Sequence, residues 1–239
     1  MALIELIKVS RTYKMGETTI QALMDINLEI EQQTFVSFVG PSGSGKTTLL
    51  NLIGCLDSPN DGEIKVNDVR VNDFNRKEAA VFRGTNIGFI FQNFNLLPVL
   101  SVYENVEYPL IMVQNIPQNE RRARVLKYLD AVGMTDQKDK YPSQISGGQK
   151  QRAAVARALV THPKMVLADE PTANLDHASA FKVIELMRQM QRGLKTTFIF
   201  STHDPKIVKE AEIIYTIEDG RLVNREEIAN PNIQAQEEN

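Results

Sequence analysis

The sequence predicts an α/β fold with a mainly parallel core sheet, an N-terminal antiparallel β subdomain and an α-helical subdomain. Three observations predict it. From residue 164 onward, short apolar runs typical of strands alternate with helical patterns, which favours a parallel sheet covered by helices. The first thirty residues contain alternating apolar positions, typical of a half-exposed antiparallel sheet. Between residue 93 and about residue 161 the strand signals disappear and helical patterns replace them.

The bulk composition places the chain among globular proteins. It has 239 residues, 42% of them hydrophobic, and a formal net charge of -3, which argues against a nucleic-acid-binding surface. No apolar run approaches the ~20 residues that cross a bilayer, and the first residues lack a basic leader, so we expect a cytosolic chain. The single Cys55 excludes an intramolecular disulfide, and its apolar neighbours favour a packing role.

The N-terminal thirty residues read as two or three strands. Candidate strands cover 4–9, 20–23 and 26–30, with a polar turn at 14–17. Tyr13 stands just before that turn. Its aromatic ring fits ordinary sheet packing and equally a platform for an adenine ring, and position alone leaves both interpretations open.

The next stretch fits the phosphate-binding pattern G-x-x-x-x-G-K-[ST]. It lies between a buried strand at 35–39 and a helix over 48–53, which is the context that the pattern requires. Glycines let the backbone N–H groups point at phosphate oxygens, and the helix N-terminus adds its partial positive charge. The alternative, a plain Gly/Ser-rich turn, does not explain the Lys-Thr pair. The sequence therefore predicts a P-loop NTPase with a nucleotide triphosphate bound by Gly40, Pro41, Ser42, Gly43, Ser44, Gly45, Lys46, Thr47 and Thr48. Lys46 would reach the β- and γ-phosphates and Thr47 would ligate Mg²⁺.

Elements after the phosphate loop follow in order. We expect strands at 63–66 and 87–91, a helix over 76–83, and Gln92 at the end of the second strand. Ser101 and Glu104 form a capping box at a helix start, and further helices are expected over 117–132 and 148–160. We interpret 93–161 as a helical subdomain inserted in the core of a single domain over 1–228. Ordinary crossover helices are the alternative, but their number exceeds what one crossover needs.

The C-terminal third returns to strand–helix alternation. We expect strands at 164–168, 196–200 and 213–217, helices over 179–192 and 206–210, and a hairpin turn at Asp219-Gly220. The polar tail, 229–239, is expected to be flexible.

Polar groups end two of the predicted core strands. Asp169 and Glu170 follow a buried strand, where α/β sheets present their ligands, and adjacent carboxylates there need a cationic partner such as Mg²⁺. Asp169 would serve the metal and Glu170 would polarise the attacking water. Ordinary strand-end acids are the alternative. His203 would donate to a γ-phosphate, or else cap the helix beginning near Asp204. Three scattered histidines without cysteine partners do not indicate a zinc site.

A second candidate anion site lies at the start of the 148–160 helix. Its residues are Ser146, Gly147, Gly148 and Gln149, which offer free backbone N–H groups and a hydroxyl without bulky side chains. One nucleotide does not need two such helix termini. The economical interpretation is that this site serves a nucleotide on another copy, which predicts a head-to-tail homodimer closed by ATP.

With these motifs in order, the chain resembles the ATP-binding-cassette ATPases from Leu3 to Arg225. The stretch 145–149 resembles the family's signature motif, with Ile145 in place of the usual leucine; 165–172 resembles the Walker B strand and 174–176 the D-loop. Gln92, His203 and Tyr13 fall at the Q-loop glutamine, the switch histidine and the adenine-stacking aromatic. The resemblance implies catalytic roles for Glu170, His203 and Gln92, metal ligation by Thr47, Gln92 and Asp169, and nucleotide contacts from Tyr13, Ser146 to Gln149, and Asp176.

Within that family, 88–92, 96–98 and 104–106 resemble the bacterial lipoprotein-release and macrolide-export group. This implies an ATPase subunit that drives a separate membrane permease, which docks near Phe94–Pro109, from the cytoplasmic face of the bacterial inner membrane. Substrate specificity would then reside in the permease, and no nucleic-acid partner is expected. The alternative is a soluble cassette ATPase acting in nucleic-acid transactions or cofactor assembly without a permease.

Overall fold

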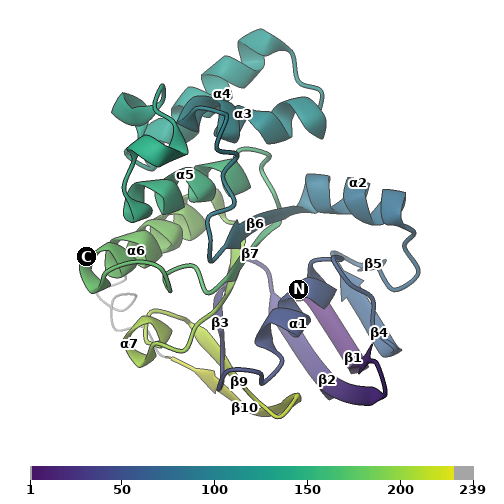
Figure 1. Ribbon diagram of the computed structural model, residues 1–239. Helices are drawn as coiled ribbons and strands as arrows, with labels where there is room; N and C mark the ends of the chain where they lie inside the picture. The colour runs from purple at the N-terminus through teal and green to yellow at the C-terminus, as the bar shows by residue number, and fades with distance from the viewer. Residues whose placement is uncertain (1, 229–239) are drawn as a thin grey trace, which may run out of the picture.

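The computed structural model describes residues 2–228, and its strands form two sheets (Figure 1). The N-terminal sheet is antiparallel, with the order β2-β1-β4-β5: β1 (Ala2–Met15), β2 (Thr18–Glu31), β4 (Asp61–Val66) and β5 (Val69–Arg70). The core sheet has the order β10-β9-β3-β8-β7-β6: β3 (Phe35–Val39), β6 (Ile87–Phe91), β7 (Met165–Asp169), β8 (Thr197–Ser201), β9 (Ile213–Glu218) and β10 (Arg221–Glu227). All its neighbouring strands are parallel except β9 and β10. The predicted fold class is confirmed.

The N-terminal strands are longer than the pattern indicated, and their number, two, lies within the predicted two or three. Two strands of 14 residues each form one hairpin across Gly16, whose φ of 62° suits the turn. Irregularities in their pairing break the period-two pattern, which is why it read as shorter pieces. Strand β5 was not predicted, because its two residues are too few to show any periodicity.

Seven α-helices accompany the sheets in the described part of the chain. They are α1 (Lys46–Ile53), α2 (Arg76–Asn86), α3 (Val102–Met112), α4 (Gln118–Ala131), α5 (Gly147–Leu159), α6 (His177–Leu194) and α7 (Pro205–Val208). The capping box at Ser101 forms as predicted, with Glu104 returning a carboxylate to the Ser101 N–H. No described helix is both long and apolar enough to cross a membrane. The predicted flexible tail lies outside the described residues.

Between β6 and β7 the described chain holds helices and no strand. There α3, α4 and α5 pack on one another, and Figure 1 shows them grouped beyond one edge of the core sheet. Gly88 on β6 lets α5 approach closely, because a Cβ at that position would lie 2.3 Å from the Ala158 carbonyl oxygen. Helix α5 therefore packs directly on β6, the strand that ends at Phe91 immediately before Gln92.

The core sheet is buried on both faces. Side chains of β8 alternate: Phe198 and Phe200 belong to the cluster shared with α3 to α6, whereas Ile199 belongs to the cluster shared with α1 and the N-terminal sheet. Each of the three is completely buried. Because β3, β7 and β8 are parallel, their carboxyl ends meet at one edge, and polar side chains at or just after those ends are brought together there.

Candidate nucleotide and magnesium site

The phosphate loop joins β3 to α1 through glycines in backbone conformations that other residues rarely adopt. Gly43 has φ 80° with open space around it, and Gly45 has φ 108°. A Cβ on Gly45 would lie 2.6 Å from the Ala22 carbonyl oxygen, so the loop is held tightly against β2. The first-turn N–H groups of α1 have no partners within the helix and remain available to phosphate oxygens.

The Lys46 side chain lies back along the phosphate loop. Its Nζ donates to the carbonyl oxygens of Gly40 at 2.7 Å and Pro41 at 2.9 Å, and only 7% of the residue is exposed. An ammonium group held this way is pre-positioned over the loop, where it can transfer its hydrogen bonds to phosphate oxygens. Thr48, the last predicted loop residue, is half-buried on α1.

Thr47 and Asp169 come together from α1 and β7. The Thr47 hydroxyl donates to the Asp169 carboxylate, with oxygen–oxygen distances of 3.1 and 3.0 Å. Two ligands about 2.1 Å from one octahedral Mg²⁺ lie roughly 3 Å apart, so this oxygen pair fits that ion. No described cluster of three or more His, Cys, Asp or Glu side chains could hold a metal alone. Mg²⁺ would therefore be held largely by nucleotide phosphates, and it would neutralise charge on them.

Glu170 adopts a left-handed backbone conformation, with φ 46°. Its N–H donates to Ser201 Oγ at 2.8 Å, and the Ser201 hydroxyl in turn donates to Asp169 Oδ1 at 2.7 Å. A non-glycine residue keeps such a conformation only where its surroundings fix it, and here a fully buried serine fixes both acids. Sequence analysis missed Ser201, although a polar residue that ends an apolar strand was the available signal.

His203 faces Glu170 directly. Its Nδ1 lies 3.0 and 3.1 Å from the two carboxylate oxygens, and the side chains are 69% and 18% exposed respectively. The imidazole therefore stands on the solvent side of a largely covered carboxylate. The Glu170 carboxylate, which can accept a proton, and the His203 imidazole, which can donate one, therefore lie within hydrogen-bond distance of each other at the mouth of the site.

Two predicted residues near the site show other contacts. The Gln92 side chain makes no hydrogen bond to Thr47 or Asp169 among the described residues; instead its backbone oxygen accepts from Asn174 Nδ2 at 3.0 Å. Asp176 caps α6, because its carboxylate accepts from the Ser179 N–H at 3.0 Å. Hydrogen bonds from Ser179 lower the pKa of Asp176. The hydrogen bond between Asn174 and Gln92 thus links the segment before α6 to the segment after β6.

Tyr13 lies on β1, and no hydrogen bond joins it to the phosphate loop. Its hydroxyl donates to Asp57 Oδ2 at 2.7 Å, and the Arg11 guanidinium lies 4.7 Å from its ring centre. Asp57 also pairs with Arg11 at 2.7 Å, so the ring is held from two sides. Its predicted role against an adenine ring stays a prediction.

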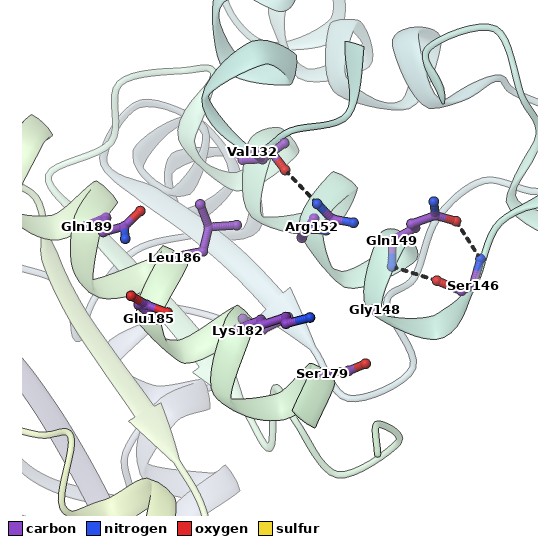
Figure 2. Close-up of a pocket in the computed structure, with 11 residues that line it drawn as sticks. Val132, Ser146, Gly148, Gln149, Arg152, Ser179, Lys182, Glu185, Leu186 and Gln189 are labelled. Atoms are coloured by element: carbon purple, nitrogen blue, oxygen red, sulfur yellow. Dashed lines mark hydrogen bonds between the residues drawn. The ribbon is translucent and has the colours of Figure 1, made fainter. Parts of the chain in front are cut away.

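The predicted second anion site forms the N-terminus of α5 (Figure 2). Ser146 Oγ accepts from the Gln149 N–H at 3.3 Å, and Gln149 Oε1 accepts from the Ser146 N–H at 2.9 Å. This capping box fixes the turn and leaves the N–H groups of Gly147 and Gly148 without intrahelical partners. An open cavity of about 390 Å³ adjoins it, lined by Val132 at the end of α4 and by residues of α5 and α6 that include Arg152 and Lys182; no phosphate-loop residue lines it.

Known proteins of one family are similar to this chain in sequence. A family model described as ABC transporter matches residues 23–173. The chain is 43% identical over 229 residues to the ABC transporter ATP-binding protein MJ0796 of Methanocaldococcus jannaschii, which covers 95% of this chain and 97% of that protein. It is also 42% identical to the macrolide export ATP-binding/permease protein MacB of Syntrophobacter fumaroxidans, over 92% of this chain and 31% of that protein.

A solved structure gives the same result in three dimensions. The dimeric, post-hydrolysis structure of the cassette MJ0796 bound to ADP and Pi superposes with a TM-score of 0.87 at 41% identity, and covers 95% of this chain and 99% of that one. Together with the family match and the nucleotide site described above, this shows that the chain belongs to the ATP-binding-cassette family, as an ATPase subunit of the ABC transporter type.

Proposed function

We propose that two copies of the chain close head to tail around two Mg²⁺-bound ATP molecules and so drive a separate membrane permease. One observation carries this proposal: Lys46, Thr47, Asp169 and Glu170 converge at one sheet edge, whereas the Ser146 motif lies elsewhere and points into an open cavity. A nucleotide on the converged groups leaves the Ser146 motif free for the nucleotide of a partner. The dimeric arrangement of the structurally similar cassette supports the same assembly.

Each group at the site has a chemical role in this proposal. Lys46 and the loop N–H groups bind the phosphates, while Thr47, Asp169 and Gln92 hold the magnesium ion. Glu170 accepts the proton of the attacking water, and Ser201 keeps both acids in place. His203 holds the Glu170 carboxylate from the solvent side and contacts the γ-phosphate. Tyr13 stacks on the adenine, and Asp176 contacts the nucleotide across the dimer.

Ser146→Arg should spare ATP binding within one chain and block dimer closure. A long cationic side chain would occupy the space in which the partner's γ-phosphate must lie. Because Ser146 is exposed, the arginine side chain can extend into solvent without disturbing the packing of the chain. Light scattering with and without Mg·ATP measures dimer closure. A control variant must lie outside the cavity next to Ser146, which excludes Ser179 on the neighbouring helix. Ser58→Arg, in an exposed turn region after α1, serves instead. An unchanged ATP-dependent dimer fraction in Ser146→Arg would contradict the shared site.

The permease would dock on an apolar groove beside the segment Phe94–Pro109. The groove has a volume of about 370 Å³ and lies between α2, β6 and α3, with Leu56 and Val113 exposed at its wall. Arg157 donates to the carbonyl oxygens of Phe94 and Asn95, and burial lowers the pKa of that guanidinium to about 10. The docking segment is thereby tied to α5, the helix that carries the Ser146 motif. An amphipathic permease helix fits such a groove.

The loop before α3 is held in place by one buried amide. Asn105, 1% exposed, accepts from the Leu97 N–H at 2.7 Å and donates to three carbonyl oxygens, including Leu100 at 3.0 Å. This network presents Val99, which is 80% exposed, on the surface. Leu97, which is 39% exposed, adds a second apolar side chain to the surface of this loop, and contiguous exposed apolar surface is what marks a protein contact.

Val99→Asp is expected to release the permease without affecting the fold, because the side chain is exposed and the change adds one charge to the proposed apolar contact. The measurement is co-purification from detergent-extracted membranes. The matched control, Val223→Asp, alters an exposed valine on β10. A permease recovered equally with Val99→Asp and with the parent chain would remove this loop from the interface.

By its likeness to MacB, we place the chain in the macrolide-export and lipoprotein-release group, at the cytoplasmic face of a bacterial inner membrane. The alternative, a soluble ATPase in nucleic-acid transactions or cofactor assembly, is not favoured by the relatives. Identifying the membrane protein that co-purifies with the chain tests this choice.

A further inference from the structure

A second polar cavity lies at the opposite end of the core sheet from the nucleotide site. Its volume is about 430 Å³, and it is lined where β7 and β8 begin, together with the end of α4 and the turn before β3. Strands β7 and β8 are five residues long, so at roughly 3.3 Å per residue the cavity lies about 17 Å from Asp169 and Ser201. It shares no lining residue with the phosphate loop.

The cavity is positively charged. Lys127, Lys164 and Lys195 line it, and none of their ammonium groups has an ion-pair or hydrogen-bond partner among the described residues. No Asp or Glu is present among the described lining residues. His162 also lines the cavity, and its pKa is lowered by burial and further by Arg124 and Lys127. The charges around this histidine are therefore cationic, which favours an anionic ligand.

Two hydroxyl groups on largely buried residues are available to such a ligand. Tyr128 lines the cavity and only 2% of the residue is exposed; its hydroxyl has no hydrogen-bond partner among the described residues and is not one of the fully buried unpaired polar atoms, so it opens to the cavity. The proton of this open hydroxyl is therefore available to an acceptor inside the cavity. Thr197 is 1% exposed, and its Oγ1 accepts from the Gln33 N–H at 2.8 Å, which leaves its own proton free to donate.

We propose that this cavity binds a phosphate monoester, with Tyr128 and Thr197 donating to its oxygens and the three lysines balancing its charge. Several ammonium donors around a compact, multiply charged anion match the chemistry of the lining, and the volume is that of an ordinary small-ligand pocket. The same phosphate chemistry occurs in free phosphorylated metabolites and in the head group of phosphatidic acid. The experiment separates these two sources.

Glycerol phosphate is the soluble probe, and the chain is first saturated with Mg·ADP so that the phosphate loop is occupied. Amide NMR shifts are expected in residues 127–128, 162–164 and 195–197. Tyr128→Phe removes one hydroxyl that bonds nothing in the protein, and should weaken binding roughly tenfold, as loss of a hydrogen bond to a charged group does. Tyr141→Phe, at an exposed tyrosine outside the cavity and outside the docking segment, is the matched control and should leave binding unchanged.

A charge-neutralising pair tests the lysines. The double variant Lys127→Gln, Lys164→Gln should weaken glycerol phosphate binding by at least about tenfold. The control double variant Lys8→Gln, Lys77→Gln makes the same change in net charge at exposed positions and should weaken binding less than about twofold. Equal losses in the two double variants would overturn the proposal, because the effect would then be a general one of net charge. Absence of shifts in the three named segments at millimolar probe would also overturn it.

Vesicle sedimentation distinguishes the sources. Binding to phosphatidic acid vesicles but not to phosphatidylcholine vesicles, weakened about tenfold in Tyr128→Phe, assigns the lipid head group. Binding of glycerol phosphate in solution without vesicle binding assigns a free metabolite. Binding to neither probe overturns the proposal.

Discussion

Lys46→Ala is expected to reduce ATP turnover by roughly 10²–10³-fold, the usual cost of removing one preorganised donor from a charged transition state. The ammonium is held over the phosphate loop by the carbonyl oxygens of Gly40 and Pro41, so binding ATP requires only that these two bonds be exchanged for bonds to phosphate. Their loss in the variant should lower the free energy of unfolding by only about 1–2 kcal/mol. Turnover assays and circular dichroism on the same preparations test both statements.

The matched control is Lys77→Ala, which removes an exposed lysine from α2 and should leave turnover unchanged. A folded Lys46→Ala variant that hydrolyses ATP at the parent rate would overturn the assignment of the phosphate loop. Loss of turnover together with loss of the folded signal would show that Lys46 supports the loop's structure, and Lys46→Arg, which keeps a donor, would then separate the two roles.

Local patterns predicted most of the elements that carry the site. The strand over 35–39 and the capping box at Ser101 depend on neighbours within a few residues, and each was found as expected. The strand predicted over 164–168 was found one residue later, so that Asp169 is its last residue and Glu170 follows it. Such features are set by short-range sterics and hydrogen bonds, which a sequence displays directly. The long N-terminal strands were underestimated because bulges interrupt their periodicity.

Contacts between distant segments could not be predicted. Ser201 reaches Glu170 and Asp169 across β7 and β8, and only the order of strands in the sheet places it there. The hydrogen bond between Asp57 and Tyr13, 44 residues apart, likewise depends on how the segment that follows α1 lies against β1. Gln92 was correctly placed at the end of β6, yet its side chain makes no hydrogen bond to the magnesium ligands. The sequence pattern predicts where a residue lies within its helix or strand, whereas tertiary packing determines which other residue its side chain contacts.

The geometry around Glu170 separates substrate binding from chemistry. Its backbone is held by Ser201, and its carboxylate meets His203 rather than the phosphate loop. The ammonium, hydroxyl and carboxylate groups that would hold Mg·ATP belong to Lys46, Thr47 and Asp169. Changing only the chemistry of the Glu170 side chain should therefore leave the binding groups where they are.

Glu170→Gln is accordingly expected to bind Mg·ATP, to close as a dimer and to remain closed. The amide keeps the shape of the carboxylate and can still meet His203, but it cannot accept the proton of the attacking water. Loss of that general base costs ~10²–10⁴-fold in rate, or roughly 3–5 kcal/mol of barrier. Subunit mass by light scattering, with and without Mg·ATP, and turnover in parallel are the two measurements, made on the chain alone and with its permease.

The control is Glu120→Gln, an exposed glutamate paired with Arg124 one helical turn away, for which turnover should stay at the parent value. Hydrolysis by Glu170→Gln at the parent rate would remove Glu170 from the mechanism. An inactive variant that binds ATP but stays monomeric would keep Glu170 as the base and contradict closure. Combining Glu170→Gln with Ser146→Arg sharpens the test, because the trapped dimer should then dissociate while each chain keeps its nucleotide. Persistence of the dimer in that combination would show that the α5 terminus does not bind the partner's nucleotide.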